Sequence, residues 1–246
     1  MTTSMSEGVM SELLRRVPMF ADLPQAEIES VTRTARALPR RKGARIFEEG
    51  SPADCCLVLT SGRAKVALSG AGGAEITLGF VEPFNVVGEM GLLDGSPRSA
   101  SLIAIEECQF IRIPAQAFHA LRRNPAFADR LLSHVSSTLR KANDQLRAIY
   151  TFRAEDRIVW GLGRLARQRG RTQGATIVIQ PKPAHQELAD MTGCSRETVS
   201  RALTSLKRRK CLTWDDDSLR LHADILERHI RGGLGLADVT ELTRLV

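Results

Sequence analysis

Residues 88 to 100 read GEMGLLDGSPRSA, and this stretch constrains both the fold and the function of the chain. Gly88 and Gly91 permit backbone conformations and close approaches that a side chain would block. Glu89 is an acceptor-only carboxylate that suits a hydroxyl group. Arg98 carries a planar guanidinium, which can hold a phosphate through two charge-assisted hydrogen bonds. The pattern therefore predicts a small site for an anionic ligand that also carries a hydroxyl.

The spacing within this stretch supports a shared site. Residues 94–97 (DGSP) predict a turn that folds Arg98 back towards Glu89, and Ser99 adds a hydroxyl beside the guanidinium. An alternative is that Glu89 and Arg98 simply pair with each other. The order, spacing and glycines together favour the ligand.

The sequence around this stretch is rich in β-strand signals. Short runs of strand-forming residues alternate with turn signals from Gly43 to Pro114, which predicts an antiparallel barrel, roll or sandwich. An amphipathic helical region is expected before it, at residues 11–38. The strands are expected at 45–47, 56–59, 64–68, 75–78 and 100–105.

A long helix is predicted after this β region, beginning near Pro125. Its apolar residues recur at alternating steps of four and three, which is typical of a helix paired with a second copy of itself. The alternative is a helix packed on its own domain. Asn143 lies beside the seam, where it could reach a ligand or the partner chain. The predicted dimer seam consists of Leu132, Val135, Leu139, Ala142, Leu146 and Ile149.

The C-terminal third predicts a helix-turn-helix followed by a β-hairpin wing at residues 211–222. Residues 185–191 form the first helix, Gly193 lies in the turn, and Ser195 caps a second helix that ends near Lys210. The polar side chains of the second helix suit the major groove, where Arg pairs with guanine and Glu accepts from cytosine. A solvated helix without base contacts is the alternative. The predicted DNA-contacting residues are Ser195, Arg196, Glu197, Thr198, Ser200, Arg201 and Lys207.

The charge distribution agrees with a nucleic-acid partner. The chain has a net charge of +7, yet residues 151–210 alone hold 13 basic and 5 acidic residues. A basic block confined to one segment is the electrostatic footprint of nucleic-acid binding.

Composition excludes several other classes of protein. At 246 residues, 43% hydrophobic and 26% charged, the chain suits two modest globular domains. No apolar run is long enough to span a bilayer and no secretory signal is present, so we expect a cytoplasmic protein without membrane partners. Five scattered cysteines give neither a disulfide framework nor a metal signature. No catalytic motif occurs, so we do not expect an enzyme.

Both ends of the chain resemble one family. Residues 88–100 resemble the phosphate-binding cassette of cyclic-nucleotide-binding domains, and residues 193–201 (GCSRETVSR) resemble the recognition helix of CRP/FNR-type bacterial transcription regulators, in particular the cyclic AMP receptor branch. The resemblance covers about residues 11–225. It implies an α+β fold with an N-terminal antiparallel β-roll or jelly-roll, a long dimerisation helix and a C-terminal winged helix-turn-helix. The implied domains are 11–124 (cyclic-nucleotide-binding), 125–152 (dimerisation helix and hinge) and 153–225 (DNA-binding), with 226–246 an extension of unknown role.

The same resemblance implies a function for the chain and a role for each of its candidate site residues. The chain would be an allosteric homodimer that binds TGTGA-like palindromic sites in double-stranded DNA, controlled by cyclic AMP, with RNA polymerase as a partner and no metal. Glu89 would bind the ribose 2′-hydroxyl, Arg98 and Ser99 the cyclic phosphate, and Arg196, Glu197 and Arg201 the bases. The implied nucleotide-site residues are Gly88, Glu89, Met90, Gly91, Arg98, Ser99, Ala100, Ala142 and Asn143.

Two alternatives stay open. The family's adenine-contacting Thr-Ser pair is replaced by Ala142-Asn143, so a regulator that prefers cyclic GMP or ignores nucleotides remains possible. A regulatory subunit of an enzyme is a second alternative, against which the helix from Ser195 to Lys210 argues. The sequence identifies neither the target genes nor whether they are activated or repressed.

Overall fold

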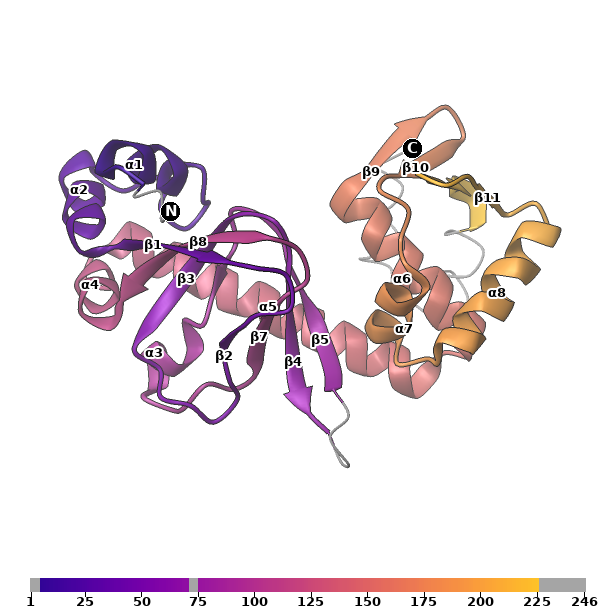
Figure 1. Cartoon of the computed structure of the whole chain (residues 1–246), viewed down its shortest axis with the longest axis horizontal. Coiled ribbons are helices and arrows are strands. Elements are labelled where there is room, and N and C mark those ends of the chain that lie inside the picture. The colour runs from indigo at the N-terminus through magenta and orange to yellow at the C-terminus, as the bar shows by residue number, and fades with distance from the viewer. Residues whose placement is uncertain (1–4, 71–74, 226–246) are drawn as a thin grey trace. The chain divides into compact units, whose positions relative to one another are not determined.

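The computed structural model describes residues 5–70 and 75–225 of the chain. It divides into two compact units, Met1–Arg140 and Lys141–Val246. One helix, α5 (Pro125–Thr151), runs through the boundary between them (Figure 1). The predicted extension at 226–246 lies outside the described residues.

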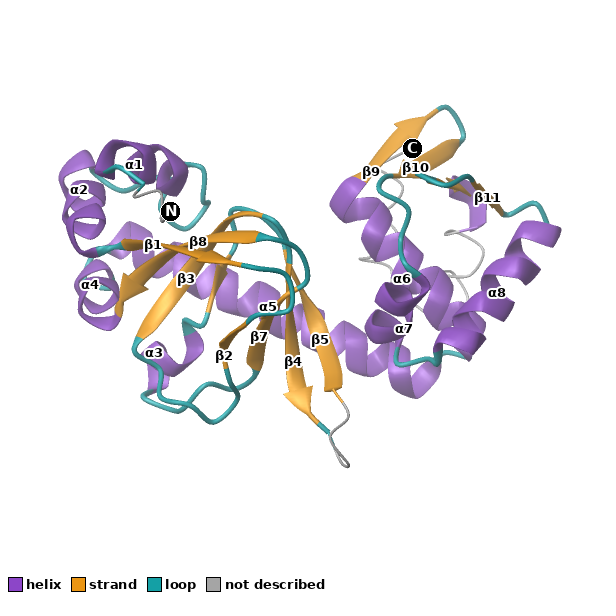
Figure 2. Ribbon diagram, in the orientation of Figure 1, coloured by secondary structure: helices purple, strands orange, loops and turns teal. Residues whose placement is uncertain are grey.

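The first unit is built from short helices and two antiparallel sheets (Figure 2). Its strands are ordered β1-β8-β3-β6 in one sheet and β2-β7-β4-β5 in the other, which confirms the predicted antiparallel roll. The helices that precede α5 are α1 (Glu7–Arg15), α2 (Gln25–Thr34), α3 (Met90–Asp94) and α4 (Ala115–Leu121). The strands are β1 (Arg36–Arg40), β2 (Arg45–Phe47), β3 (Cys55–Ser61), β4 (Ala64–Ser69), β5 (Glu75–Val81), β6 (Val86–Val87), β7 (Ser101–Ala104) and β8 (Cys108–Pro114).

Strand β3 shows how alternation builds the core on both faces of its sheet. Successive side chains of a strand point to opposite faces. Cys55, Leu57 and Leu59 accordingly pack in a cluster with residues of β7 and β8, whereas Cys56 and Val58 pack on the helices. Cys55 and Cys56, adjacent in the sequence, thus lie on opposite faces of the sheet.

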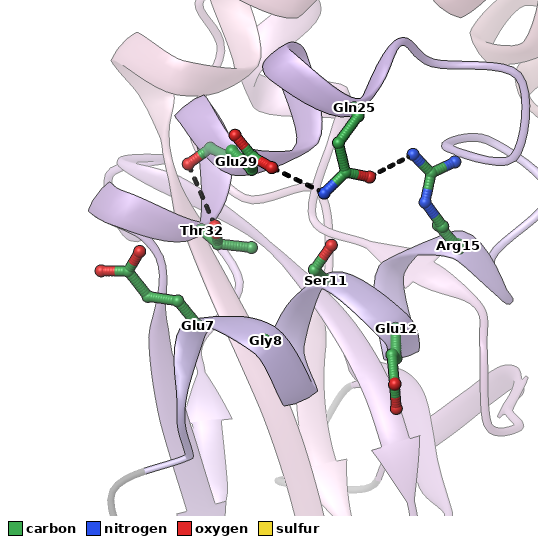
Figure 3. Close-up of a pocket in the computed structure, with 8 residues that line it drawn as sticks. All are labelled: Glu7, Gly8, Ser11, Glu12, Arg15, Gln25, Glu29 and Thr32. Carbon is green, nitrogen blue, oxygen red and sulfur yellow. Dashed lines mark hydrogen bonds between the residues drawn. The ribbon is translucent and has the colours of Figure 1, made fainter.

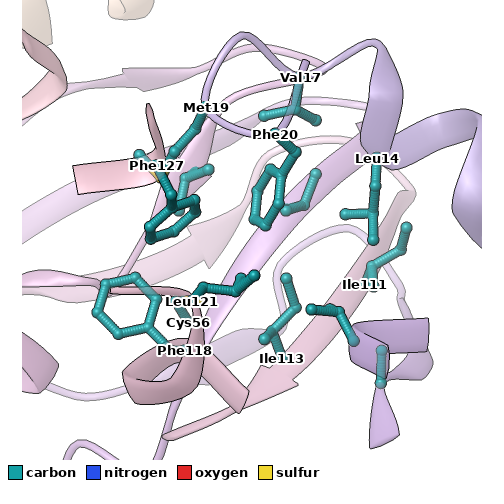
Figure 4. Close-up of a cluster of buried hydrophobic side chains, with 14 of the residues drawn as sticks. Leu14, Val17, Met19, Phe20, Cys56, Ile111, Ile113, Phe118, Leu121 and Phe127 are labelled. Carbon is teal, nitrogen blue, oxygen red and sulfur yellow. The ribbon is translucent and has the colours of Figure 1, made fainter. Parts of the chain in front are cut away.

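The helical side of this core contains the rings of Phe20, Phe118 and Phe127 among mainly aliphatic side chains (Figure 4). The ring centroids of Phe20 and Phe127 are 5.5 Å apart, and those of Phe118 and Phe127 are 5.8 Å apart at an interplanar angle of 80°. The second pair is edge-to-face, an arrangement that stabilises a core beyond its buried area. Phe127 belongs to α5, so this cluster fixes the first part of α5 on the first unit.

One sequence prediction for this unit was wrong. The helical region was expected to extend to residue 38, but Arg36–Arg40 is strand β1 and pairs with β8 along its full length. Pro39 cannot donate a backbone hydrogen bond within a helix, and pairing with a long buried strand prevails over local helix preference.

The second unit begins in α5 and contains the remaining helices and a small sheet ordered β11-β12-β10-β9. The predicted wing is confirmed as strands β11 and β12. Residues 170–173 form β9, a strand that the sequence did not predict and that pairs with β10 residue by residue. The elements after α5 are α6 (Ala154–Arg169), β9 (Gly170–Gln173), β10 (Thr176–Ile179), α7 (His185–Thr192), α8 (Arg196–Arg208), β11 (Leu212–Trp214) and β12 (Leu219–His222).

Candidate ligand and nucleic-acid sites

Glu89 is a buried carboxylate at the start of α3. Its relative exposure is 5%, although ionised carboxylates are rarely buried unless paired. Its partner is His134 of α5, whose Nε2 lies 3.2 Å from Glu89 Oε1. The residue predicted to meet a hydroxyl is therefore held inside the first unit, in contact with α5.

Arg98 is even more completely buried, with its side chain 3% exposed. Its Nη1 donates to the Gly88 carbonyl at 2.7 Å and its Nη2 to Cys55 Sγ at 3.3 Å. The guanidinium also lies 4.3 Å from the centroid of the Phe47 ring and 3.5 Å from the Asp54 carboxylate. Glu89 and Arg98 do not pair with each other by any described contact, so the self-pairing alternative is not what the structure contains.

The Nε of Arg98 is buried and has no hydrogen-bond partner among the described residues. A buried donor without a partner is costly, and one on a cation is more so. Its neighbour Asp54 lies 3.5 Å away but is 66% exposed, so it compensates only weakly. An anion bound here would supply the missing acceptor.

The glycines of this stretch are required by close packing. Gly88 has φ of 82°, and a Cβ there would lie 2.6 Å from Arg98 Nη1. A Cβ on Gly91 would lie 2.5 Å from both Ala53 Cβ and the Ser96 carbonyl oxygen. Both positions leave no room for a side chain, as predicted for a backbone that closes around a small ligand.

The predicted turn at residues 94–97 is present. The amide of Ser96 donates to Asp94 Oδ1 at 2.9 Å, and Gly95 adopts the left-handed conformation. Ser99 is exposed, and its hydroxyl lies 3.9 Å from the sulfur of Met90. Ala100, the last residue of the stretch, is 5% exposed and serves as core.

Four residues that surround the site escaped sequence analysis: Phe47, Asp54, Cys55 and His134. They come from β2, the loop before β3, β3 itself and α5, so no local spacing joins them to residues 88–100. Only the pairing of distant elements reveals them.

The pKa values of Asp54 and Cys55, which lie beside Arg98, are shifted from their ordinary values. Partial burial acts to raise the pKa of Asp54, but the hydrogen bond from Cys55 and the charge of Arg112 outweigh it, and the pKa is lowered. Burial raises the pKa of the Cys55 thiol, and Asp54 beside it adds to the rise. Cys55 therefore stays neutral, and Asp54 is the anion nearest to the guanidinium.

The first unit also has two surface hollows that do not include Glu89 or Arg98. One, of about 440 Å³, lies between α1 and α2 (Figure 3) and is crossed by the hydrogen bonds Arg15–Gln25 and Gln25–Glu29. The other, of about 560 Å³, is lined by residues of the 91–97 segment, Gly91 among them, by His119 of α4 and by Arg122 just after it. Neither is lined by Glu89 or Arg98. We assign the ligand site from the buried charges, because neither hollow presents an unpaired buried polar group.

Helix α5 exposes most of the predicted apolar seam. Leu132 is 66% exposed, Leu139 61%, Leu146 52% and Ile149 46%, and Ala142 is exposed as well. Val135 differs, because it is half-buried against the core of the first unit. Asn143 is exposed on the same helix, in the second unit, so its place beside the ligand stays a prediction.

The helix-turn-helix is held by capping and by a buried face. Ser195 Oγ accepts the Thr198 amide at 3.2 Å, as predicted for the cap of α8, and Gly193 turns the chain with φ of 61°. One face of α8 is buried, and its residues are Val199, Ala202, Leu203 and Leu206. A Cβ on Gly161 of α6 would lie 2.7 Å from Thr192 Cγ2, so α6 and α7 meet closely.

The opposite face of α8 presents the predicted DNA-contacting residues. Arg196, Glu197 and Arg201 are exposed, whereas Thr198 and Ser200 are half-buried. Backbone and Ser195 hydrogen bonds lower the pKa of Glu197, which keeps it ionised. Burial lowers the pKa of His185, and the nearby charges of Arg196 and Lys182 lower it further, so the start of α7 adds no cation at neutral pH.

Lys207 has a contact that the sequence did not predict. Its Nζ lies 4.2 Å from the centroid of the Trp214 ring in β11, and Lys182 Nζ lies 5.8 Å from the same ring. Arg209 pairs with Glu155 of α6. The basic end of α8 is therefore partly tied to its own unit by cation–π and ionic contacts.

Two other kinds of site are absent from residues 5–70 and 75–225. Within those ranges no group of three or more His, Cys, Asp or Glu side chains could hold a metal ion. No helix in the same ranges has the length and hydropathy needed to cross a membrane.

Comparison with known proteins identifies both units. Residues 39–124 match the family model of the cyclic nucleotide-binding domain, and residues 156–228 match that of the Crp-like helix-turn-helix domain. The chain is 32% identical over 190 residues to the cyclic AMP receptor protein of Thermus thermophilus, which covers 77% of this chain and 85% of that protein. The chain belongs to the CRP/FNR family.

Further relatives agree with this placement. A CRP-like cAMP-activated global transcriptional regulator of Mycobacterium tuberculosis is 26% identical over 201 residues, or 81% of this chain and 90% of the relative. The c-di-GMP responsive regulator CLP of Xanthomonas campestris has the same fold, with a TM-score of 0.68 at 22% identity over 81% of this chain and 99% of its own. CRP/FNR proteins are DNA-binding transcription regulators rather than enzymes, and this chain has the family's cyclic-nucleotide-binding domain.

Proposed function

We propose that this CRP/FNR regulator is a homodimer whose DNA binding is controlled by a cyclic nucleotide, with cyclic AMP as the favoured ligand. The observation that carries the proposal is the buried Arg98 guanidinium with an orphaned Nε, in the same unit as the buried carboxylate of Glu89. Two of the relatives are named for cyclic AMP. The CLP structure is named for c-di-GMP, so the fold alone does not select the ligand.

In this proposal each end of the stretch 88–100 recognises a different part of the nucleotide. Arg98 and Ser99 would bind the cyclic phosphate, because a guanidinium forms strong paired hydrogen bonds with phosphate oxygens. Glu89 would accept the ribose 2′-hydroxyl. Gly88, Met90, Gly91 and Ala100 would let the backbone close around the sugar and phosphate.

The base is the part of the ligand that is least constrained. In the proposed dimer it would lie near Ala142 and Asn143, whose side chains are exposed on α5. The amide of Asn143 both donates and accepts, so it could serve the edge of adenine or of guanine. Cyclic GMP is therefore the second candidate ligand.

DNA recognition would use the exposed face of α8. Arg196 and Arg201 would pair with guanine and Glu197 would accept from cytosine in a TGTGA-like half-site, while Ser195, Thr198, Ser200 and Lys207 would contact the backbone or orient these side chains. The exposed apolar residues of α5 would join two copies, so that the ligand could change the placement of two such helices. A regulator of this kind would act on double-stranded DNA in the cytoplasm, together with RNA polymerase.

The test is calorimetric titration of cyclic AMP and cyclic GMP into the wild type and Arg98→Leu, with and without a TGTGA-N6-TCACA duplex. We expect Arg98→Leu to weaken nucleotide binding more than tenfold, because truncating one partner of a buried charge pair costs about 2–5 kcal/mol. Arg45→Leu, which removes an exposed arginine that pairs with Glu75, is the matched control. If Arg98→Leu binds cyclic AMP as tightly as the wild type, the ligand site is wrongly assigned.

A further inference from the structure

The contact between His134 and Glu89 joins the proposed sugar-binding carboxylate to α5. His134 Nε2 lies 3.2 Å from Glu89 Oε1, and the two side chains are 26% and 6% exposed. Among the described residues it is the one polar contact given to the Glu89 side chain. A carboxylate buried this deeply depends strongly on its few partners.

The position of His134 on α5 is fixed by its neighbours. Leu131 is 6% exposed in the core of the first unit, and Val135 packs against that core. The helix therefore turns His134 towards the first unit, while Leu132 faces out with 66% exposure. One turn of helix thus carries both the Glu89 contact and the start of the exposed apolar seam.

The contact leaves capacity at Glu89 for a second donor. An ionised carboxylate has two oxygens and about four acceptor positions. His134 takes one position on Oε1, and a hydroxyl could use another without displacing it. His134 would thus orient the carboxylate rather than compete with the ligand.

We propose that His134 is a positioning residue that holds Glu89 to receive the sugar hydroxyl of the nucleotide, so that recognition of this hydroxyl depends on the placement of α5. The inference rests on the proposed function, because it assumes that Glu89 binds the 2′-hydroxyl. Through Glu89 and His134, the bound ligand would be connected to α5, the helix whose apolar face is exposed. By linkage, whatever fixes α5 would also strengthen binding of the hydroxyl-bearing ligand.

The experiment compares cyclic AMP with 2′-deoxy cyclic AMP by calorimetric titration of the full chain. Wild type should prefer cyclic AMP by about ten- to a hundredfold, the range expected for a hydrogen bond to a charged group. In His134→Leu we expect this preference to fall below about threefold, because cyclic AMP binds more weakly while the deoxy analogue is unchanged. His134→Gln, whose amide can donate to Glu89, should restore most of the preference. His119→Leu, the same change at an exposed histidine of α4, should leave it intact.

The outcomes separate the two proposals. If wild type shows no preference for the 2′-hydroxyl, or binds neither nucleotide, the proposed role of Glu89 fails and this inference fails with it. If wild type shows the preference and His134→Leu keeps it, only the inference is overturned. Equal weakening of both nucleotides in His134→Leu means a purely structural role and also overturns it. Should His134→Leu fail to fold, His134→Asn, with an amide too short to reach Glu89, replaces it in the comparison.

Discussion

At the scale of single residues, the ligand site is an arrangement of buried charges that are incompletely compensated. Arg98 is surrounded by a carbonyl, a thiol and an aromatic face, and its one carboxylate neighbour, Asp54, is largely exposed. A stable core would avoid a buried cation with an unpartnered donor. We interpret the arrangement at Arg98 as part of the proposed anion site, where a bound phosphate would supply the missing acceptor.

Asp54 should make stability depend on acid pH. Its pKa is lowered in the folded chain, so its ionised form stabilises the fold above its unfolded pKa, and this contribution is lost as the pH falls through the lower folded value. We expect Asp54→Asn to reduce the free energy of unfolding at pH 7 by less than about 1 kcal/mol, because the pair is exposed. Denaturant titrations should show the difference between wild type and variant shrinking below about pH 4. A difference that grows towards acid pH would contradict this account.

Glu197 should read one base pair in each half-site. Its exposed, ionised carboxylate can accept from a cytosine amine, so Glu197→Ala should lower discrimination at that position by about 1–3 kcal/mol. The exposed Arg208 provides the contrast. Arg208→Ala should weaken binding to all duplexes alike and reduce the slope of log K against log salt concentration by about one. Gel-shift titrations on single-base variants decide the matter. Uniform weakening by Glu197→Ala would remove it from the set of base readers.

At the scale of elements, α8 combines a well-formed start with a strained end. Ser195 caps its first turn, but the residue that reverses the chain after it is Lys210, with φ of 57°. Glycine usually occupies this left-handed position, because a Cβ there is unfavourable. At the C-terminal end of α8, the chain therefore places a lysine where the backbone conformation favours glycine.

Replacing Lys210 by Gly should stabilise the second unit. Relief of the left-handed strain exceeds the added freedom of the unfolded glycine, so the net gain should be at most about 1 kcal/mol. Denaturation followed by tryptophan fluorescence reports on this unit, because Trp160 and Trp214 both lie in it. Lys210→Ala removes the charge but keeps the Cβ and should give no gain. Equal stabilisation by both variants would show that charge, not backbone strain, is responsible.

The elements that sequence analysis predicted are those with strong local signals. The cap at Ser195, the turn at residues 94–97 and the long helix after Pro125 depend on local chemistry, and all are present. Strands β1, β6, β8 and β9 were not among the predicted strands. For β1 and β9 the pairing partners, rather than their own residues, make them strands. Likewise Glu89 and Arg98 were predicted from one continuous stretch. Their neighbours His134 and Phe47 come from other elements and could be found only in three dimensions.

At the scale of the whole molecule, the main feature is the apolar surface that α5 leaves exposed. Leu132, Leu139 and Leu146 recur every seven residues, Ile149 follows three residues later, and each is about half exposed or more. Exposed apolar surface of this regularity marks an interaction site, and a second α5 supplies a matching surface by symmetry. We therefore infer that the exposed side of α5 is the interface of the proposed dimer.

Leu139→Glu should dissociate the proposed dimer. A charge at an apolar seam position should weaken association at least tenfold, which corresponds to about 1.4 kcal/mol. Sedimentation velocity at micromolar concentration should show a wild-type dimer and a monomeric variant. Ser133→Glu, which adds the same charge at an exposed position away from the seam, should leave the dimer intact. A monomeric wild type, with and without nucleotide, would refute the assigned interface.

The distribution of thiols around α8 has a practical consequence. Cys55, Cys56 and Cys108 are buried, whereas Cys194 and Cys211 are half-buried. The latter pair flanks α8, whose 13 residues span about 20 Å. A maleimide dye should therefore label the natural chain first at the two ends of the helix proposed to enter DNA, and protection of these two sulfurs by a duplex would map the contact without engineering a single cysteine.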